Sequence, residues 1–266
     1  MKGVVLAGGS GSRLFPLTLV TNKHLLPVFD RPMIYHPLAT LRRIGCREVM
    51  VVVGGRSVGD ILELLHDGSD VGLHLTYRYQ RGAFGIAHAI GLAKAFADDD
   101  PIAVVLGDNV LQDEGCLHDF AAAFVAGESE AGAVLTEVVD PTRFSVAEIG
   151  PDGVIVGFEE KPREPKSHLI PVGVYFFRPS VFEVIEGLRP SGRGELEITD
   201  LLNHYLQRKS LVHTVYRGQW QDAGTIESLL QANALAASFA ADQPLDTRHD
   251  VAEVRPPVGE SVRPLS

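Results

Sequence analysis

Cysteine is scarce in this sequence of 266 residues, because only Cys46 and Cys116 are present. Two thiols are too few for a disulfide framework or for a structural zinc site, so these small-protein classes are excluded. Long apolar runs are also missing, since no stretch approaches the roughly 20 residues that a helix needs to cross a bilayer. The apolar run of residues 4–6 becomes glycine-rich too early for a signal peptide. We therefore expect a cytoplasmic protein with no membrane partner.

Basic residues are outnumbered, with 24 Lys and Arg against 34 Asp and Glu and a formal net charge of −10. Proteins that coat nucleic acid bind its phosphates with clustered Lys and Arg, so we expect no nucleic-acid partner. Apolar residues, in contrast, make up 45% of the chain and charged residues only 22%. This balance is typical of a chain that buries a core, and the length allows one large α/β domain or two small ones.

Short runs rich in Val, Ile and Leu alternate with stretches of helical periodicity from residue 3 to about residue 125. This alternation predicts a parallel sheet with crossover helices. The expected strands cover residues 3–6, 49–53, 73–79, 102–106, 133–138, 154–159, 172–177 and 212–216. The expected helices cover residues 37–44, 59–65, 87–96, 118–125, 197–207 and 226–241.

From about Ala131 the strand-like runs lie closer together, and no polar linker separates them from the first half. We therefore predict an α/β fold of Rossmann-like, three-layer architecture. Its central sheet is expected to be mostly parallel, with a mixed C-terminal extension, in one domain of residues 1–241. Residues 242–266 lack periodicity and are expected to form a loosely ordered tail.

A glycine-rich loop follows the first expected strand. Gly8, Gly9 and Gly11 allow a sharp turn whose backbone N–H groups approach an anion, and Arg13 adds a guanidinium suited to phosphate oxygens. The spacing matches neither the Walker A pattern nor Gly-x-Gly-x-x-Gly. The alternative is a tight turn with a solvated arginine, and Lys23 by itself is typical of a surface lysine.

Several blocks recur together in one order, and this combination resembles the sugar-1-phosphate nucleotidyltransferases, most closely the glucose-1-phosphate thymidylyltransferases. The blocks are LAGGSGSRL at 6–14, PLT at 16–18, NKHLLPV at 22–28, VLGDN at 105–109, EEKP at 159–162, GELEITD at 194–200 and WQDAGT at 220–225. The resemblance covers roughly residues 1–240. It implies an enzyme that joins a hexose 1-phosphate, glucose 1-phosphate first, to a nucleoside triphosphate, dTTP first. Pyrophosphate would be released and a dTDP-sugar formed.

The same resemblance divides the domain into a nucleotide-binding half, residues 1–125, and a sugar-binding half, residues 126–241. It implies Mg²⁺ as the cofactor, held by Asp108 and Asp222, and it leaves an oligomer of identical chains open. On the residues alone, Asp108 is also compatible with a turn-capping role after a strand, and Asp222 with an Asx-turn before a glycine. Only one or two protein carboxylates are usual for Mg²⁺ bound to a polyphosphate.

The remaining site residues are likewise implied by the resemblance. Arg13, Lys23 and Lys161 are the expected catalytic residues. The expected nucleotide-binding residues are Leu6, Ala7, Gly8, Gly9, Gly11, Ser12, Arg13, His24, Gln80, Gly85 and Asp108. The expected residues for the sugar phosphate are Asn109, Ser145, Glu160, Lys161, Pro171 and Arg193. Glu197 and Asp200 are compatible either with the rim of the sugar pocket or with the acidic first turn of a helix.

Three departures from the family pattern leave the base and the sugar open. His24 stands where Gln is usual, Phe144-Ser145 where Tyr-Gly is usual, and Pro171-Val172-Gly173 where Val-Thr-Gly is usual. UTP, CTP or ATP and another sugar 1-phosphate are therefore alternatives within the same chemistry.

Two other function classes compete with the transferase. A non-catalytic nucleotide-sensing relative is one. A dinucleotide-dependent oxidoreductase is the other, and it requires an acidic residue at the end of the second strand. The second expected strand here ends in Gly54-Gly55, which disfavours the oxidoreductase.

Overall fold

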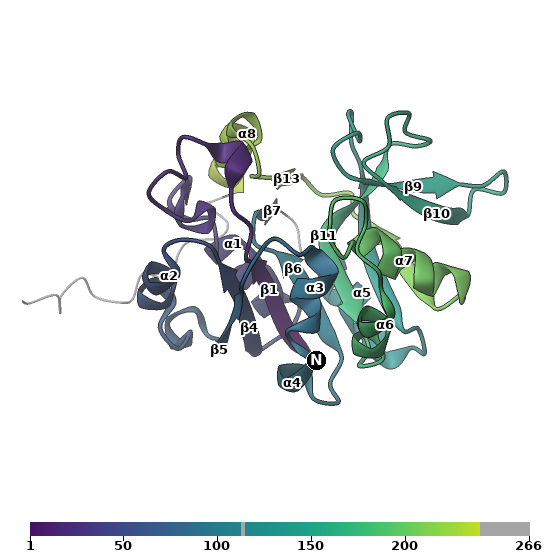
Figure 1. The fold of residues 1–266 in the computed structure, drawn as a ribbon, viewed down its shortest axis with the longest axis horizontal. Helices are drawn as coiled ribbons and strands as arrows, with labels where there is room; N and C mark the ends of the chain where they lie inside the picture. The colour runs from purple at the N-terminus through teal and green to yellow at the C-terminus, as the bar shows by residue number, and fades with distance from the viewer. Residues whose placement is uncertain (113–114, 240–266) are drawn as a thin grey trace, which may run out of the picture.

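A computed structural model describes residues 1–112 and 115–239 of the chain (Figure 1). A seven-stranded sheet of order β12-β8-β11-β6-β1-β4-β5 forms its centre. Four strands from the first half are parallel to one another, as the alternation of strands and helices predicts. They are β1 (Lys2–Ala7), β4 (Glu48–Gly54), β5 (His74–Gln80) and β6 (Ile102–Leu106).

The second half of the chain extends this same sheet. It contributes β8 (Ala131–Glu137), β11 (Leu169–Phe177) and β12 (Leu211–Val215). Strand β11 pairs antiparallel with both β6 and β8, while β12 is parallel to β8. Within the seven-stranded sheet β11 is thus the one strand of opposite direction, and the predicted mixed extension is confirmed.

Helices cover both faces of the sheet because its strands are apolar on both faces. Val5 and Ala7 belong to the cluster beneath α1 (Tyr35–Arg43), α2 (Val58–Leu65) and α5 (Gly115–Ala126). Val4 and Leu6 pack on the opposite side. The helices of that side are α3 (Ile86–Gly91), α4 (Lys94–Ala97), α6 (Val181–Gly187) and α7 (Ile198–Gln207). The three-layer prediction is therefore confirmed.

Smaller elements lie outside the main sheet. One ladder joins β7 (Asn109–Leu111) to β13 (Trp220–Asp222), and α8 (Ile226–Phe239) packs against it. A hairpin joins β9 (Ser145–Ile149) to β10 (Ile155–Glu160), and a short ladder joins β2 (Pro27–Val28) to β3 (Arg31–Pro32). Figure 1 shows β7 and β13 near α8, and the β9–β10 hairpin at the other side of the molecule beside α7.

The helix expected over residues 87–96 is wrong in its continuity, because α3 ends at Gly91 and α4 begins at Lys94. The amide of Ala93 bonds to the carbonyl of Ile90, three residues back, so the α-helical pattern is interrupted there. The tail predicted for residues 242–266 lies outside the described residues. In residues 1–112 and 115–239, no helix combines the length and apolarity required to cross a membrane.

Candidate active site

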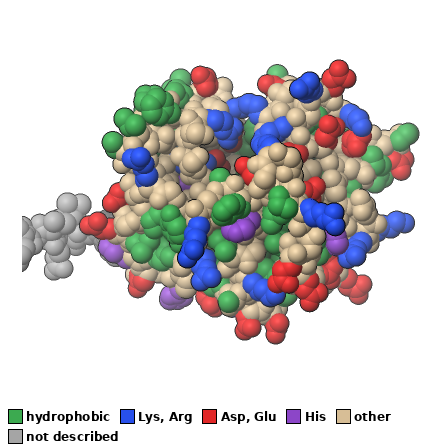
Figure 2. Space-filling view, viewed as in Figure 1, with side chains coloured by type: hydrophobic (Ala, Val, Ile, Leu, Met, Phe, Trp, Pro, Cys, Tyr) green, Lys and Arg blue, Asp and Glu red, His purple; other side chains and the backbone are tan. Residues whose placement is uncertain are grey.

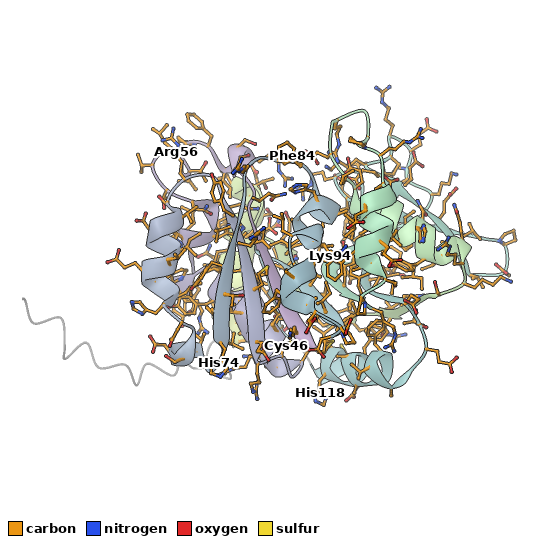
Figure 3. The ribbon with its side chains drawn as sticks, turned by 60° about the horizontal axis from the view of Figure 1, so that its bottom comes forward. Cys46, Arg56, His74, Phe84, Lys94 and His118 are labelled. Atoms are coloured by element: carbon orange, nitrogen blue, oxygen red, sulfur yellow. The ribbon has the colours of Figure 1, made fainter. Side chains whose placement is uncertain are left out.

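Two adjoining cavities open at the carboxyl ends of the parallel strands, where ligands of open α/β sheets bind. In Figure 3, Arg56 and Phe84, which follow β4 and β5, lie at one end of the molecule. Cys46, which precedes β4, and His74, the first residue of β5, lie at the opposite end. Figure 2 shows a hollow in the upper half of the molecular face, bordered by Lys and Arg side chains.

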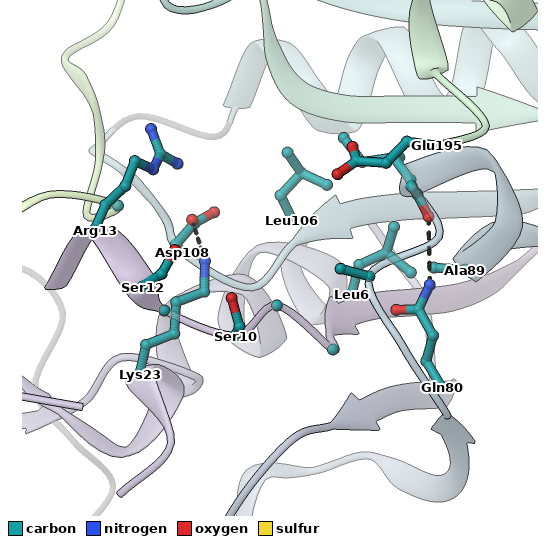
Figure 4. A pocket seen from close by; sticks show the side chains of 17 residues that line it. Leu6, Ser10, Ser12, Arg13, Lys23, Gln80, Ala89, Leu106, Asp108 and Glu195 are labelled. Carbon is teal, nitrogen blue, oxygen red and sulfur yellow. Dashed lines mark hydrogen bonds and ion pairs between the residues drawn. The ribbon is translucent and has the colours of Figure 1, made fainter. Parts of the chain in front are cut away.

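The larger cavity, of about 320 Å³, is called here the loop cavity because the glycine loop forms one wall (Figure 4). Its lining includes Leu6, Gly8, Gly9, Gly11, Ser12, Arg13, Lys23, Gln80, Gly85 and Asp108. The smaller one, of about 180 Å³, is called the Glu160 cavity, and its lining includes Asp108, Asn109, Arg143, Ser145, Glu160, Lys161, Pro171, Arg193, Trp220 and Asp222. Arg13 and Asp108 line both cavities, so they stand at the junction.

The glycine loop leaves β1 and enters a 3₁₀ turn at Ser12–Leu14, with no α-helix behind it. Gly11 precedes this turn with φ 67°, a conformation that favours glycine, and its carbonyl accepts a hydrogen bond from Thr18 Oγ1 at 2.9 Å. The loop therefore offers backbone N–H groups and the Arg13 guanidinium to an anion without the dipole of a long helix.

Lys23 reaches the junction from a separate segment that is anchored by Asn22. The Asn22 amide donates to the carbonyls of Gly54 and Arg56 at 3.0 and 3.1 Å, which ties this segment to the end of β4. Lys23 Nζ lies 2.6 Å from Asp108 Oδ2, and both side chains are largely buried. Burial by itself would raise the pKa of Asp108, but the Lys23 ammonium outweighs it and lowers this pKa to about 2.

Asp222 comes to the same junction through the ladder between β13 and β7. Asp222 pairs with Asn109 in this ladder, and the Ala223 amide donates to the Asp108 carbonyl at 2.8 Å. A Cβ built on Gly224 would lie 2.9 Å from Asp222 Oδ2, 3.0 Å from Arg13 Nη2 and 3.5 Å from Asp108 Oδ2. Two carboxylates and one guanidinium therefore converge around a glycine that leaves space between them.

The electrostatics of Asp222 fit a divalent cation. Its Oδ1 is buried without a hydrogen-bond partner, although Arg143 Nη2 lies 3.8 Å away. Burial, and next the neighbouring Asp108 carboxylate, raise the pKa of Asp222. Among the described residues no cluster of three His, Cys, Asp or Glu could hold a metal ion. Two carboxylates suit Mg²⁺, which takes most of its ligands from phosphate and water. The Asx-turn alternative is present as well, since the Gly224 amide donates to Asp222 Oδ2 at 3.2 Å.

The opposite wall of the loop cavity is built by the segment that leads into α3. Gly85 has φ 96°, and any side chain there would collide with the Leu196 backbone. The segments are joined by hydrogen bonds from the Leu196 amide to the Phe84 carbonyl at 2.8 Å and from the Ala87 amide to the Leu196 carbonyl at 3.1 Å. Glycine is therefore required at position 85.

A network of charges and hydroxyls surrounds Glu160. Its Oε1 lies 3.2 Å from Lys161 Nζ and 3.1 Å from Arg193 Nη2, and its Oε2 lies 2.6 Å from Thr199 Oγ1. The Thr199 hydroxyl is also 3.0 Å from Ser145 Oγ. Because a hydroxyl carries one proton, donation by Thr199 to Glu160 requires it to accept from Ser145. Glu160 is thereby held in one orientation at the cavity wall.

Almost all predicted site residues line one of the two cavities, and Ala7 and His24 are the exceptions. Both are fully buried in the described structure. His24 Nδ1 lies 2.7 Å from Asn22 Oδ1, while burial, and next the Lys23 charge, lower its pKa to about 3. The expectation that His24 binds the nucleotide therefore has no support in the structure, because its ring packs beneath Gly107 and lines neither cavity.

For Glu197 and Asp200 the sequence left two alternatives open, the rim of the sugar pocket or the acidic first turn of a helix, and the two residues differ in this respect. Glu197 lines the Glu160 cavity at the start of α7 and bonds to Arg193 at 2.9 Å. Asp200 stands in the first turn of α7 and is absent from both cavity linings.

Three further residues that were not predicted from the sequence also belong to the site, namely Arg143, Thr199 and Glu195. Arg143 and Thr199 have the contacts described above, and Glu195 lines both cavities. Glu195 and Thr199 belong to the GELEITD block at 194–200, so the resemblance of this block to the family could have identified them as site residues. Arg143 has no local signal, since its partner Asp222 is distant in the chain.

The family model described as Nucleotidyl transferase matches residues 2–238. Low-salt glycan biosynthesis nucleotidyltransferase Agl11 of Haloferax volcanii is 42% identical over 236 residues, 88% of this chain and 66% of that relative. The glucose-1-phosphate thymidylyltransferase of Streptomyces antibioticus is 40% identical over 235 residues, 88% of this chain and 65% of that relative. The chain thus spans 66% and 65% of the lengths of these two relatives.

Solved structures show the same fold. One from Bacillus anthracis, in complex with a sucrose and assigned as a glucose-1-phosphate thymidylyltransferase, is 46% identical with a TM-score of 0.84. The match covers 89% of this chain and 95% of that chain. UDP-glucose pyrophosphorylase complexed with UDP-glucose shares the fold with a TM-score of 0.79 at 23% identity, over 89% of this chain and 98% of that chain. With the family model matching nearly all of the described residues, the chain belongs to the nucleotidyl transferase family.

Proposed function

We propose that this protein transfers a nucleotidyl group from a nucleoside triphosphate to a hexose 1-phosphate and releases pyrophosphate. dTTP and glucose 1-phosphate are the proposed substrates, and a dTDP-sugar is the product. The observation that carries the proposal is the junction between the two cavities, where Asp108, Asp222 and Arg13 converge around Gly224. Relatives 40% identical to this chain are named glucose-1-phosphate thymidylyltransferases, which supports this pair of substrates.

Distinct cations serve the two substrates in this proposal. Arg13 and the glycine-loop N–H groups hold the β- and γ-phosphates in the loop cavity, and Lys23 holds the α-phosphate. Lys161 holds the phosphate of the sugar in the Glu160 cavity. Two phosphate groups repel each other, so cations placed between them lower the free energy of their approach.

The proposed reaction is an in-line displacement at the α-phosphorus. An oxygen of the sugar phosphate forms a bond to this phosphorus, while the bond from the phosphorus to the bridging oxygen of the β-phosphate breaks. Pyrophosphate leaves with the electron pair of that bond. A phosphate oxygen is already negatively charged, so no general base is required and positioning is the main contribution of the protein.

Asp108 and Asp222 are the residues that would hold Mg²⁺. When bound, the ion supplies charge neutralisation for the polyphosphate. The buried Oδ1 of Asp222, which has no hydrogen-bond partner, supports this assignment, as does the raised pKa of this carboxyl, caused by burial and by Asp108.

The remaining walls of the cavities are proposed to select the substrates. Gln80 and the Gly85 amide contact the base, Leu6 and Ser12 complete the nucleotide wall, and the Glu160 carboxylate binds sugar hydroxyls. Asn109, Ser145, Pro171 and Arg193 close the sugar side. A cytoplasmic location and an assembly of identical chains remain part of the proposal.

The experiment is a pyrophosphate-release assay with Mg²⁺ over a grid of dTTP, UTP, CTP and ATP against several sugar 1-phosphates. We expect the highest kcat/KM with dTTP and glucose 1-phosphate. Highest activity with another pair of substrates would support the proposed nucleotidyl transfer but contradict dTTP and glucose 1-phosphate as its substrates. A silent grid, together with nucleotide binding in a calorimetric titration, would favour the nucleotide-sensing relative.

A further inference from the structure

The side-chain amide of Gln80 is held by two acceptors. Its Nε2 lies 3.4 Å from the Gly85 carbonyl and 3.1 Å from His88 Nδ1 (Figure 4 draws the first of these as a dashed line). Gln80 itself is buried at the wall of the loop cavity. Both N–H bonds of the amide are therefore directed to acceptors within the protein.

These partners determine which way the amide faces. A backbone carbonyl only accepts, so the group that faces Gly85 must be the amide nitrogen and not the oxygen. The same nitrogen faces His88 Nδ1, which accepts only when the ring is neutral and carries its proton on Nε2. The amide oxygen therefore lies next to Gly8, and a side chain at position 8 would collide with this oxygen. Among the described residues the oxygen has no hydrogen-bond partner.

His88 is itself held in place on α3. Its ring meets the Phe84 ring edge-on, with 5.0 Å between the centroids, and the contact joins the first turn of the helix to the preceding loop. His88 is partly buried and is absent from the lining of the loop cavity, so it acts on a ligand only through Gln80.

We propose that His88 is a positioning residue that orients Gln80 to present only a hydrogen-bond acceptor to the base. This inference rests on the proposed function, because it requires a nucleotide in the loop cavity. An acceptor pairs with the ring N3–H of thymine or uracil, whereas the ring N3 of cytosine is itself an acceptor and is repelled. His88 therefore contributes to selection of a base with a ring imino group, although it never touches that base.

The test compares dTTP with dCTP in the wild type, His88→Leu and His88→Asn. Leucine removes the acceptor, while the Oδ1 of asparagine occupies the place of Nδ1 and restores it. We expect His88→Leu to lower the ratio of kcat/KM for dTTP over dCTP about tenfold, the worth of one hydrogen bond, through KM and not kcat. His88→Asn should recover most of the ratio. Calorimetric titration of both nucleotides gives the same comparison without turnover.

Controls separate this inference from folding and from the proposed function. His118→Leu, on the exposed surface of α5, should leave the ratio unchanged, and thermal unfolding should be two-state in every variant. In a Gln80→Leu background, His88→Leu should have no further effect on the ratio. An unchanged ratio in His88→Leu, or equal loss in the leucine and asparagine variants, overturns the positioning role alone. A wild type that neither binds nor turns over any nucleotide overturns the proposed function with it.

Discussion

The pKa of Asp222 is raised by burial and by the neighbouring Asp108 carboxylate, and its Oδ1 has no hydrogen-bond partner. Asp222→Asn removes one charge of the proposed Mg²⁺ site at nearly constant volume. We expect turnover to fall by a factor on the order of 10²–10³ in the pyrophosphate assay, by analogy with other preorganised electrostatic sites.

The stability of Asp222→Asn should stay within about 1 kcal/mol of the wild type, because burial and Asp108 already disfavour the charge. Asp140→Asn, in an exposed turn, is the matched control and should keep full activity. Turnover near the wild-type value in Asp222→Asn would remove this residue from the mechanism.

His36 illustrates a second effect at the residue scale, on stability. Burial lowers its pKa from 6.5 to about 4, and its Nε2 lies 3.4 Å from the Val28 carbonyl. Between pH 6.5 and 4 the His36 ring is protonated in the unfolded chain but neutral in the folded protein, so the free energy of unfolding falls as the pH falls. From pH 7 to 4.5 this single group should cost about 2.5 kcal/mol.

The measurement is urea unfolding of the wild type and His36→Gln at both pH values. The variant should lose about 2.5 kcal/mol less between them, whatever its own stability at pH 7. His74→Gln, which changes an exposed histidine at the start of β5, should retain the wild-type pH dependence. Parallel pH profiles for the wild type and His36→Gln would contradict the assignment.

The site residues show what a single sequence can and cannot predict at this scale. The glycine loop and Arg13 carry their own chemistry, so the expectation of an anion site follows from local residues. Ala7 lies in the same block as this loop and His24 in the block at 22–28, yet both side chains are fully buried. Burial of one position depends on which distant segment covers it, and no neighbour in sequence reveals that.

The segment entering α3 is the element on which the base side of the site depends. Gly85→Ala places a Cβ against the Leu196 backbone at φ 96°. We expect this change to lower the free energy of unfolding by about 1–3 kcal/mol and to weaken nucleotide binding, because the Gln80 wall shifts with it.

Thermal unfolding and nucleotide titration of Gly85→Ala measure the two effects. Gly59→Ala is the control, since Gly59 lies in α2 with open space around it and should gain about 0.5 kcal/mol. Full stability and affinity in Gly85→Ala would contradict the strain argument.

Element prediction succeeds where the pattern is long and fails where it is short. The eight expected strands are all present, because each is a sustained β-branched or apolar run. Strands β7 and β13 span three residues each, too few for a period of two to be visible. Helical periodicity continues through residues 87–96, but the interruption after Gly91 depends on packing and is not visible locally.

At the scale of the whole molecule, the two cavities lie between segments from both halves of the chain. We therefore expect a bound nucleotide to contact both halves and to stabilise the fold as a unit. At a dTTP concentration 100 times its Kd, in the presence of Mg²⁺, we expect about 2.7 kcal/mol of added stability and a Tm rise of about 5–10 °C.

Differential scanning calorimetry measures this rise. Thymidine, which has the same base without phosphates, is the matched control and should give a much smaller shift, since Arg13 and Lys23 face the loop cavity. An equal shift with thymidine would mean that the cations of the loop cavity contribute little to binding.

The sequence by itself determined the alternation of strands and helices, the glycine loop at the end of β1 and the chemical character of the site residues. These features depend on local patterns of polarity and backbone freedom. Only the tertiary structure decided the direction of β11, the pairing of β13 with β7 that brings Asp222 to Asp108, and the orientation of the Gln80 amide. These depend on contacts between residues distant in the chain, whose register is set by packing in three dimensions.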